Sequence, residues 1–273
     1  MNTSRHEQHG HPESSPAATL VLPPRLTDSA TSLRDTAQAR GIRTVQLPTF
    51  TVPTGLQAQH LHAGPGFADT VAENLGIALL EAPADWLATL PAQFTRREVR
   101  AMPLGEAYAL RRPVFVKSPN DKGITARVYA DGSRLPGPDA VDPTTLVLVS
   151  DVVTFTSEFR LFVLDGHVRT ASRYAQHGRL SLGPVSREGS AFAANLLAAC
   201  AHTLPSAIVI DIGTIADNQW AVIEANAAWA SGRYTADPDA LLDVVLRAAA
   251  PTSRLSRRDR PFVRPPRSTT ASH

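Results

Sequence analysis

Two acidic residues and an asparagine in the segment AIVIDIGTIADNQWAVIEAN have the spacing of a metal-binding hairpin. Asp217-Asn218 suits a two-residue turn, because both residue types tolerate positive φ. Pairing around that turn places Asp211 directly opposite Glu224, and Asn226 shares the face of Glu224. Facing carboxylates repel each other unless a cation neutralises them, and carboxylate and amide oxygens suit Mg²⁺. The alternative is a solvent-exposed polar strand face on which the charges are screened.

Lysine is rare in this chain, and both lysines lie in one short segment. Lys117 and Lys122 are the only lysines among 27 basic residues. Lys117 ends an apolar strand, and Lys122 lies in a turn-rich loop with Pro119 and Gly123. Compact cations beside phosphates and a divalent metal are recurring parts of phosphoryl-transfer sites. Two ordinary surface lysines are the alternative explanation.

The run TLVLVSDVVTFTSEFRLF is the third segment with possible chemistry. An apolar strand ends at Ser150-Asp151, and an extended apolar backbone of this kind can present N–H and C=O groups to an adenine edge. Glu158 follows seven residues after Asp151, where it could accept ribose hydroxyls, and Arg160 shares its face. The alternative is a strand, a turn and a strand with a surface Glu–Arg pair.

The elements that must position these residues divide at about residue 100. The first part alternates strands and helices, which is typical of a small α/β unit with parallel strands. It has no glycine-rich phosphate loop. Strands are expected at 18–22, 42–47 and 77–80, and helices at 27–40, 67–75 and 84–90.

The second part predicts an α+β arrangement dominated by antiparallel strands. Asp165-Gly166 is a strong hairpin signal between two of them. Ile208, Ile210 and Ile212 should take the buried face opposite Asp211. Strands are expected at 113–117, 124–129, 145–153, 159–164, 167–172, 207–215 and 220–225, and helices at 191–204 and 238–250.

Composition sets further bounds. We expect domains at 19–100 and 101–250, between tails at 1–18 and 251–273 whose composition favours disorder. The C-terminal tail carries +5, which leaves a body of −2 from 19 to 250, so a nucleic-acid-binding surface is not expected. The basic tail could instead dock on nucleic acid or an acidic partner.

The remaining exclusions concern compartment and cysteine chemistry. No apolar run is long enough to span a membrane, and the N-terminus lacks the pattern of a secretory signal. The single cysteine, Cys200, excludes an intrachain disulfide and is most simply a buried thiol on an apolar helix face. Together these features favour a cytoplasmic protein.

Taken in order, these segments resemble the ATP-grasp superfamily. The likeness is to a little-characterised group with KPxxxK, SExR and EaNxxWxSGxY stretches, which here read KSPNDK, SEFR and EANAAWASGRY. The resemblance implies two α+β lobes that clamp ATP, preceded by a small α/β domain on the substrate side. Ser118 departs from the family's proline, and Asp151 stands where a hinge glutamate is common.

The resemblance also implies roles for particular residues. In this assignment the lysines meet the phosphates, the hinge meets the adenine, Glu158 meets the ribose, and the hairpin holds one or two Mg²⁺ ions, for which Mn²⁺ could substitute. Arginines are candidates for stabilising transferred phosphoryl or oxyanion charge. The assigned residues are Lys117 and Lys122 for phosphate, Asp151 and Val153 for adenine, Asp211, Glu224 and Asn226 for metal, Arg160 and Arg173 (with Lys122) for catalysis, and Ser231, Gly232 and Arg233 for an incoming carboxylate.

The expected reaction is an ATP-dependent ligation of a carboxylate to an amine through an acyl phosphate. Partners would then be small-molecule, amino-acid or peptide substrates. A kinase that stops after phosphoryl transfer would use the same residues, and a nucleotide-binding sensor or scaffold would bind without turnover. Trp229 is more simply a packing residue than a substrate contact. Oligomeric state stays open.

Overall fold

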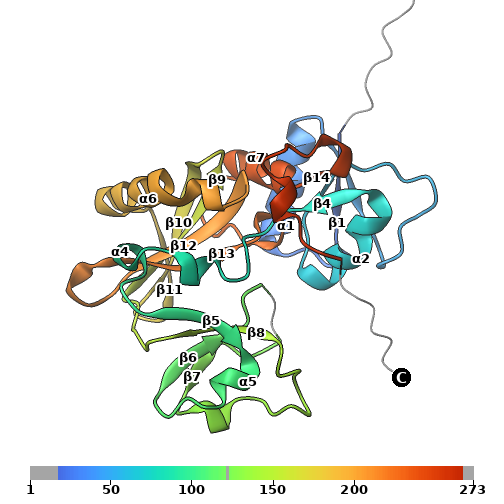
Figure 1. Cartoon of the computed structure of the whole chain (residues 1–273). Coiled ribbons are helices and arrows are strands. Elements are labelled where there is room, and N and C mark those ends of the chain that lie inside the picture. The colour runs from blue at the N-terminus through green and yellow to red at the C-terminus, as the bar shows by residue number, and fades with distance from the viewer. Residues whose placement is uncertain (1–17, 121–122, 267–273) are drawn as a thin grey trace, which may run out of the picture.

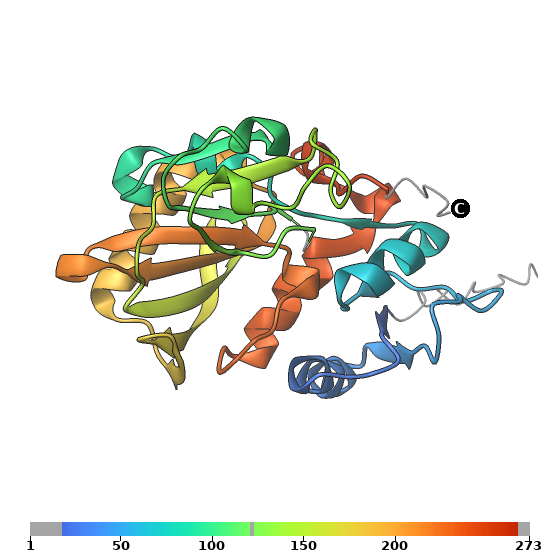
Figure 2. The ribbon, with the colours of Figure 1, turned by 90° about the horizontal axis from the view of Figure 1, so that it is seen from below.

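The structure is a computed structural model that describes residues 18–120 and 123–266. Figure 1 shows three parts: an N-terminal unit in blue to cyan, a small lobe in green, and a large lobe in yellow to orange. The small lobe lies beside the large sheet, and both adjoin the N-terminal unit, as the view from below confirms (Figure 2). The tails at 1–17 and 267–273 lie outside the described residues.

The N-terminal unit has a three-stranded parallel sheet in the order β2-β1-β3. All four residues of the central strand are buried, which fits its continuous apolar sequence TLVL. The strand at 60–61 was not predicted. The elements are β1 (Thr19–Leu22), α1 (Asp28–Ala39), β2 (Arg43–Gln46), β3 (His60–Leu61) and α2 (Pro65–Leu75).

The strand expected at 77–80 forms, but it does not join this parallel sheet. β4 (Ile77–Leu79) pairs antiparallel with β14 (Ala249–Pro251) from the end of the chain. Gly76 ends the preceding helix in the left-handed region at φ 63°, as a glycine at that position predicts. The expectation of one all-parallel unit is therefore wrong for this strand.

The small lobe is an antiparallel sheet with its own core. Val114 and Val116 of β6 face that core together with Val147 and Val149 of β8. The sheet order is β5-β8-β6-β7. The elements are β5 (Val99–Pro103), α5 (Leu104–Ala107), β6 (Val114–Lys117), β7 (Arg127–Tyr129), η1 (Gly132–Arg134) and β8 (Leu146–Ser150).

The large lobe is an antiparallel sheet in the order β11-β10-β9-β12-β13. The Asp165-Gly166 hairpin is confirmed, with β9 and β10 paired on either side and both turn residues at positive φ. The elements are α3 (Trp86–Thr89), α4 (Ala92–Thr95), β9 (Ser157–Leu164), β10 (His167–Gln176), β11 (Arg179–Gly183), α6 (Arg187–Cys200), η2 (Ala201–Thr203), β12 (Ala207–Thr214), η3 (Ala216–Asn218), β13 (Trp220–Asn226), η4 (Ala228–Ala230) and α7 (Pro238–Ala248).

Both faces of the large sheet are covered. Ile208, Ile210 and Ile212 are fully buried on the face that packs against α6, α3 and α4, as predicted. Phe162 and Val209 point the other way, into a second core. That second core also contains α7 and the N-terminal sheet and helices, so the N-terminal unit and the large lobe share one hydrophobic core.

The boundary expected at residue 100 is therefore wrong in detail. Trp86, Leu87 and Phe94 pack into the core of the large lobe rather than into the N-terminal unit. Because β5 begins at Val99, the small lobe also starts before the expected boundary.

The C-terminal segment corrects the prediction of disorder from residue 251. Residues 251–266 lie along β4 and include η5 (Thr252–Arg254) and η6 (Arg260–Phe262). Leu80 pairs with Val263, and the Arg264 N–H donates to the Leu79 carbonyl. Asp259 is buried and accepts hydrogen bonds from the backbone and hydroxyl of Ser206. These contacts outweigh a composition that favours disorder.

Candidate active site

The predicted pairing of the two carboxylates is confirmed, although the turn differs from the prediction. β12 and β13 place Asp211 opposite Glu224. The connection is longer than two residues, because the Ile215 N–H bonds to the Gln219 carbonyl. Asp217 and Asn218 still adopt positive φ within it. A bulge between the turn and the site absorbs the extra length and restores the predicted pairing.

Asp211 is fully buried and forms a two-pronged ion pair with Arg160 on the neighbouring strand. Arg160 Nε lies 2.9 Å from one carboxylate oxygen of Asp211, and Nη2 lies 2.7 Å from the other. β9 and β12 pair directly, which brings the two residues face to face. The alternative of a solvent-exposed polar face is therefore excluded for Asp211.

Glu224 pairs with Lys117 of the small lobe, and Asn226 links the two carboxylates. The Asn226 amide nitrogen is 2.8 Å from Glu224 and 3.2 Å from Asp211. Lys117 and Arg160 thus neutralise the two acids in this structure. The pair between Lys117 and Glu224 also joins the two lobes directly.

The electrostatics of the pair differ at its two members. Burial raises the pKa of Asp211 despite the opposing pull of Arg160. Burial would also raise the pKa of Glu224, but Lys117 and the hydrogen bond from Asn226 together lower it. Glu224 is therefore the carboxylate better suited to stay ionised when the local charges rearrange.

The cluster opens into a cavity of about 800 Å³ where the three parts of the molecule meet. Lys117, Glu224 and Asn226 line one side of it. The remaining lining residues come from the start of α2, the end of β4, the loop after β6, the segment after β13 and the C-terminal segment; they are Gly64, Pro65, Gly66, Glu81, Ser118, Pro119, Asn120, Ile124, Thr125, Ala126, Ala225, Ala227, Trp229, Ala230, Ser231 and Arg264.

The segment predicted to contact adenine connects the two lobes. It runs from the end of β8 at Ser150 to the start of β9 at Ser157. Val153 lies partly buried within it. The Asp151 carboxylate accepts hydrogen bonds from Arg112 and from the Glu98 N–H, and these contacts lower its pKa.

Glu158 lies on the face of Arg160, as predicted, and accepts a hydrogen bond from the Tyr174 hydroxyl at 2.8 Å. Arg160 lies over the rings of both Tyr174 and Tyr234, which stack 5.0 Å apart. Burial, followed by the nearby Asp211 and Glu158 carboxylates, raises the pKa of Tyr174 well above its usual value. Sequence reasoning missed both tyrosines, although the second belongs to the SGRY stretch.

Two predicted catalytic residues are not brought to this cluster. Arg173 is opposite Phe159, one position from the Ser172–Arg160 pair, so it points to the other face of the sheet. Its guanidinium donates to the carbonyls of Ser181 and Leu182. A β-bulge in β10 follows Arg173 and was not visible in the sequence. Lys122 lies outside the described residues.

The SGR stretch lies beside the cluster, but two of its backbone donors are already engaged. The Ser231 N–H bonds to the Ala228 carbonyl, and the Arg233 N–H bonds to the Ser29 hydroxyl. The Gly232 carbonyl accepts a hydrogen bond from Arg160 at 3.3 Å. A carboxylate that meets both backbone donors, as expected from the sequence, would have to displace these bonds.

Trp229 is a packing residue, as expected, with 1% of its surface exposed. Its indole N–H donates to the Leu80 carbonyl at 2.9 Å. The same side chain forms part of the cavity wall and lies under the Arg264 guanidinium, 5.9 Å from its ring centre.

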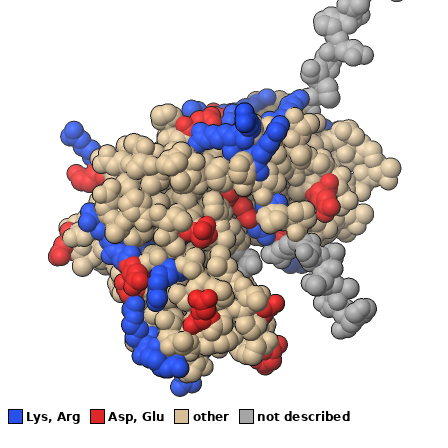
Figure 3. Space-filling model, viewed as in Figure 1, with Lys and Arg blue, Asp and Glu red and all other residues tan. Residues whose placement is uncertain are grey.

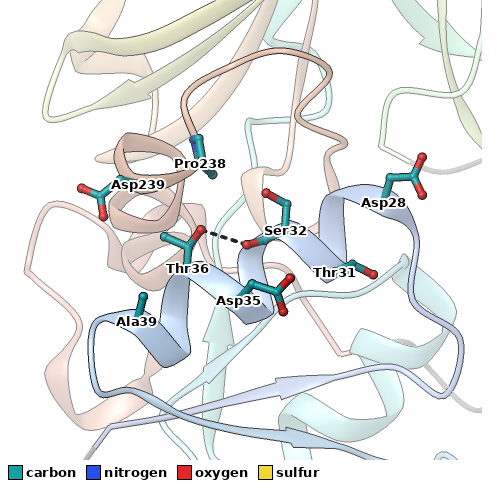
Figure 4. Close-up of a pocket in the computed structure, with 8 residues that line it drawn as sticks. All are labelled: Asp28, Thr31, Ser32, Asp35, Thr36, Ala39, Pro238 and Asp239. Atoms are coloured by element: carbon teal, nitrogen blue, oxygen red, sulfur yellow. Dashed lines mark hydrogen bonds between the residues drawn. The ribbon is translucent and has the colours of Figure 1, made fainter.

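A second hollow lies away from these residues. Figure 4 shows it between α1 and the start of α7, lined by three aspartates, hydroxyl side chains, an alanine and a proline. None of the predicted site residues lines it. Acidic groups without a paired cationic or apolar binding surface offer no nucleotide site there. The space-filling view shows basic side chains gathered over the small lobe and near the C-terminal segment (Figure 3).

Comparison with known proteins identifies the fold. A family model for the ATP-grasp domain, the second family of its clade, matches residues 94–244. No curated protein matches the sequence. Among the described residues, no helix is long and apolar enough to cross a membrane.

Solved structures share the fold at low sequence identity. D-cycloserine synthetase DcsG is 15% identical, with a TM-score of 0.55 over 85% of this chain and 99% of that one. The ATP-grasp ligase PsnB, solved with a minimal precursor, Mg and ADP, is 17% identical, with a TM-score of 0.50 over 88% and 99%. A RimK domain ATP-grasp protein from Sphaerobacter thermophilus DSM 20745 is 14% identical, with a TM-score of 0.50 over 84% and 100%.

The family match covers the whole small lobe, the hinge and the sheet that carries the buried carboxylates. The chain therefore belongs to the ATP-grasp family and has the α+β fold of ATP-grasp ligases.

Proposed function

We propose that this protein is an ATP- and Mg²⁺-dependent ligase that forms an amide or peptide bond through an acyl phosphate. The observation that carries the proposal is the group of Lys117, Arg160, Asp211, Glu224 and Asn226. It joins the two lobes beside a cavity large enough for the phosphate end of a nucleotide and a second substrate.

The hairpin residues fit a magnesium ion. They offer two carboxylates and an amide, and carboxylate and amide oxygens are hard ligands that suit this metal. In the structure the Asn226 amide nitrogen faces the carboxylates, and a half-turn of the amide would present its oxygen instead. Among the described residues, no three His, Cys, Asp or Glu side chains converge. Substrate phosphates would therefore complete the ligand set, and the ion would neutralise their charge.

The remaining nucleotide contacts are assigned by their place in the fold. Lys117 and Lys122 would bind the phosphates, so Lys117 exchanges Glu224 for a phosphate oxygen. Asp151 and Val153 in the segment between the lobes would meet the adenine. Glu158 would accept ribose hydroxyls, because its carboxylate lies on the same face of the sheet as Arg160.

The chemistry needs positioning and charge neutralisation more than a protein nucleophile. A substrate carboxylate attacks the γ-phosphorus of ATP, and the bond to ADP breaks. The amine then attacks the acyl carbon, loses a proton, and phosphate leaves. All three guanidinium nitrogens of Arg160 are engaged with Asp211 and Gly232, so we assign Arg160 to hold Asp211 in place.

Isothermal titration of ATP with and without Mg²⁺ tests the proposal. Wild-type binding should depend on Mg²⁺, and Lys117→Ala and Glu224→Ala should each weaken it by about tenfold or more. Arg100→Ala is the matched control, because Arg100 lies on the small lobe, pairs with Glu98, and does not line the cavity. Absence of nucleotide binding by the wild type under both conditions would refute the proposal.

Product analysis separates ligation from simple phosphorylation. Hydroxylamine traps an acyl phosphate as a hydroxamate, so a carboxylate substrate should yield ADP and a hydroxamate. A stable phosphorylated product that resists hydroxylamine would identify a kinase instead.

A further inference from the structure

The cavity has a second charged pair that the proposed nucleotide chemistry does not use. Four charged residues line the described part of the wall: Lys117 and Glu224 form one pair, and Glu81 and Arg264 form the other. Glu81 follows β4 of the N-terminal unit, and Arg264 belongs to the C-terminal segment. Both lie outside residues 94–244, so the family match assigns them no role.

The pair is held in a fixed geometry. Arg264 Nη1 lies 2.6 Å from Glu81, while Nε and Nη2 bind the two oxygens of Asp69 at 2.7 and 3.2 Å. The side chains of Arg264 and Glu81 are only 9% and 14% exposed. Burial raises the pKa of Glu81 against the pull of Arg264. Trp229 supports the guanidinium from its ring face.

The two acids that hold Arg264 face different spaces. Glu81 lines the large cavity. Asp69 lines a separate groove of about 190 Å³ between α2 and the C-terminal segment. Arg264 borders both. Asp69 therefore anchors the arginine from behind, whereas Glu81 and the inner edge of the guanidinium are presented to a bound substrate.

We propose that Glu81 and Arg264 bind the head group of the amine substrate, and that this substrate is a free α-amino acid. This inference rests on the proposed ligase function. A carboxylate next to a guanidinium is complementary to an ammonium next to a carboxylate. Glu81 accepts hydrogen bonds from the amino group, and Arg264 donates to the carboxylate through N–H groups beyond the three given to Asp69 and Glu81.

The pair also lies close to the loop that follows Lys117. The Asn120 side chain in that loop donates to the carbonyl of Ala82, the residue after Glu81. An amino group at Glu81 is thus next to the loop that leads from the phosphate-binding lysine. Glu81 is in a position to take the proton that the amine loses when it attacks the acyl carbon.

The test titrates the full-length protein, loaded with Mg²⁺ and a non-hydrolysable ATP analogue, with the twenty common L-amino acids and D-alanine. At least one free amino acid should bind. Its N-acetyl and carboxamide derivatives should each bind at least about tenfold more weakly, because each loses one charge-assisted contact. Equal affinity for free and capped forms, or no binding by any of the free amino acids, overturns the inference.

Two variants separate recognition from anchoring. Glu81→Gln keeps the shape and should weaken amino-acid binding by about tenfold or more, while Asp69→Asn should change it by less than about threefold. Equal losses in the two variants would mean that the pair only anchors the C-terminal segment. If Glu81→Gln fails to fold, the comparison of free and capped ligands on the wild type decides.

The same titrations distinguish the two proposals. Nucleotide binding without amino-acid binding overturns the head-group site and leaves the ligase proposal standing. Amino-acid binding in a protein that binds no nucleotide supports the head-group site and refutes the ligase proposal.

Discussion

Removing one member of the buried Arg160–Asp211 pair should destabilise the protein more than the loss of both suggests. The two side chains are 13% and 1% exposed, so either one left alone is a charge without solvent. Loss of one partner from such a pair costs about 3–5 kcal/mol. We therefore expect Arg160→Met and Asp211→Asn each to lose about that much unfolding free energy. The double variant should lose about 2–3 kcal/mol less than the sum of the two.

The pH dependence provides a second handle on the same prediction. Burial already raises the pKa of Asp211, and Arg160→Met removes the cation that opposes this rise. The folded variant would then bind a proton that the unfolded chain releases near pH 4. The cost of Arg160→Met should therefore grow as the pH rises above about 4 and level off above the new folded-state pKa.

Urea denaturation followed by tryptophan fluorescence measures these differences. The chain has three tryptophans, and all of them pack in the two cores of the large sheet. Their signal therefore reports on the part of the molecule that contains the pair. Strict additivity in the double variant, or single losses below about 1 kcal/mol, would refute the view that the two charges depend on each other.

Three further outcomes are expected. Burial lowers the pKa of His62 to about 4 from 6.5, so the folded protein should lose about 2 kcal/mol between pH 7 and pH 5 as the unfolded chain gains a proton; His62→Leu should remove this part of the urea-measured pH profile. Cys200 is buried and burial raises its pKa, so Ellman's reagent should label it only after denaturation, and rapid labelling of the native protein would contradict the packing. A chain ending at residue 250 should be destabilised in urea relative to one ending at 266, because it lacks the Leu80–Val263 bridge and the Asp259 anchor; equal midpoints would show that these contacts contribute little.

The sequence was sufficient to predict the contact between Asp211 and Glu224, because burial constrains the register. A slip by one residue would send the polar side chain into the core and an isoleucine out of it. The turn was less predictable, since several loop conformations can connect the same two strands. The bulge next to Asp211 corrected a wrong turn without changing the pairing that matters.

The partners of the acids were not predictable from local patterns. Arg160 faces Asp211 only because β9 lies beside β12, and sheet order depends on contacts between distant residues. Asp69, Glu81 and Arg264 come from three separate segments for the same reason. The segment 251–266 was misread because its arginines and prolines are typical of disorder, whereas its order depends on contacts such as that of Asp259 with Ser206.

The expected helices and most expected strands were found, because their apolar periodicity is local. The short strands β3 and β11 escaped notice, since two or five residues carry too little pattern. Arg173 was assigned to the site by its residue type alone, and alternation along β10 places it on the other face.

The pairing of β4 with β14 has a consequence for the order in which the protein can fold during synthesis. The core of the N-terminal unit includes Leu241, Leu242 and Val245 of α7, which a ribosome produces more than two hundred residues after β1. The first strands to emerge therefore lack part of their packing partners until translation is nearly finished. Because such distant contacts close large loops, this unit should be completed late and slowly, after the small lobe, whose core lies within residues 102–149.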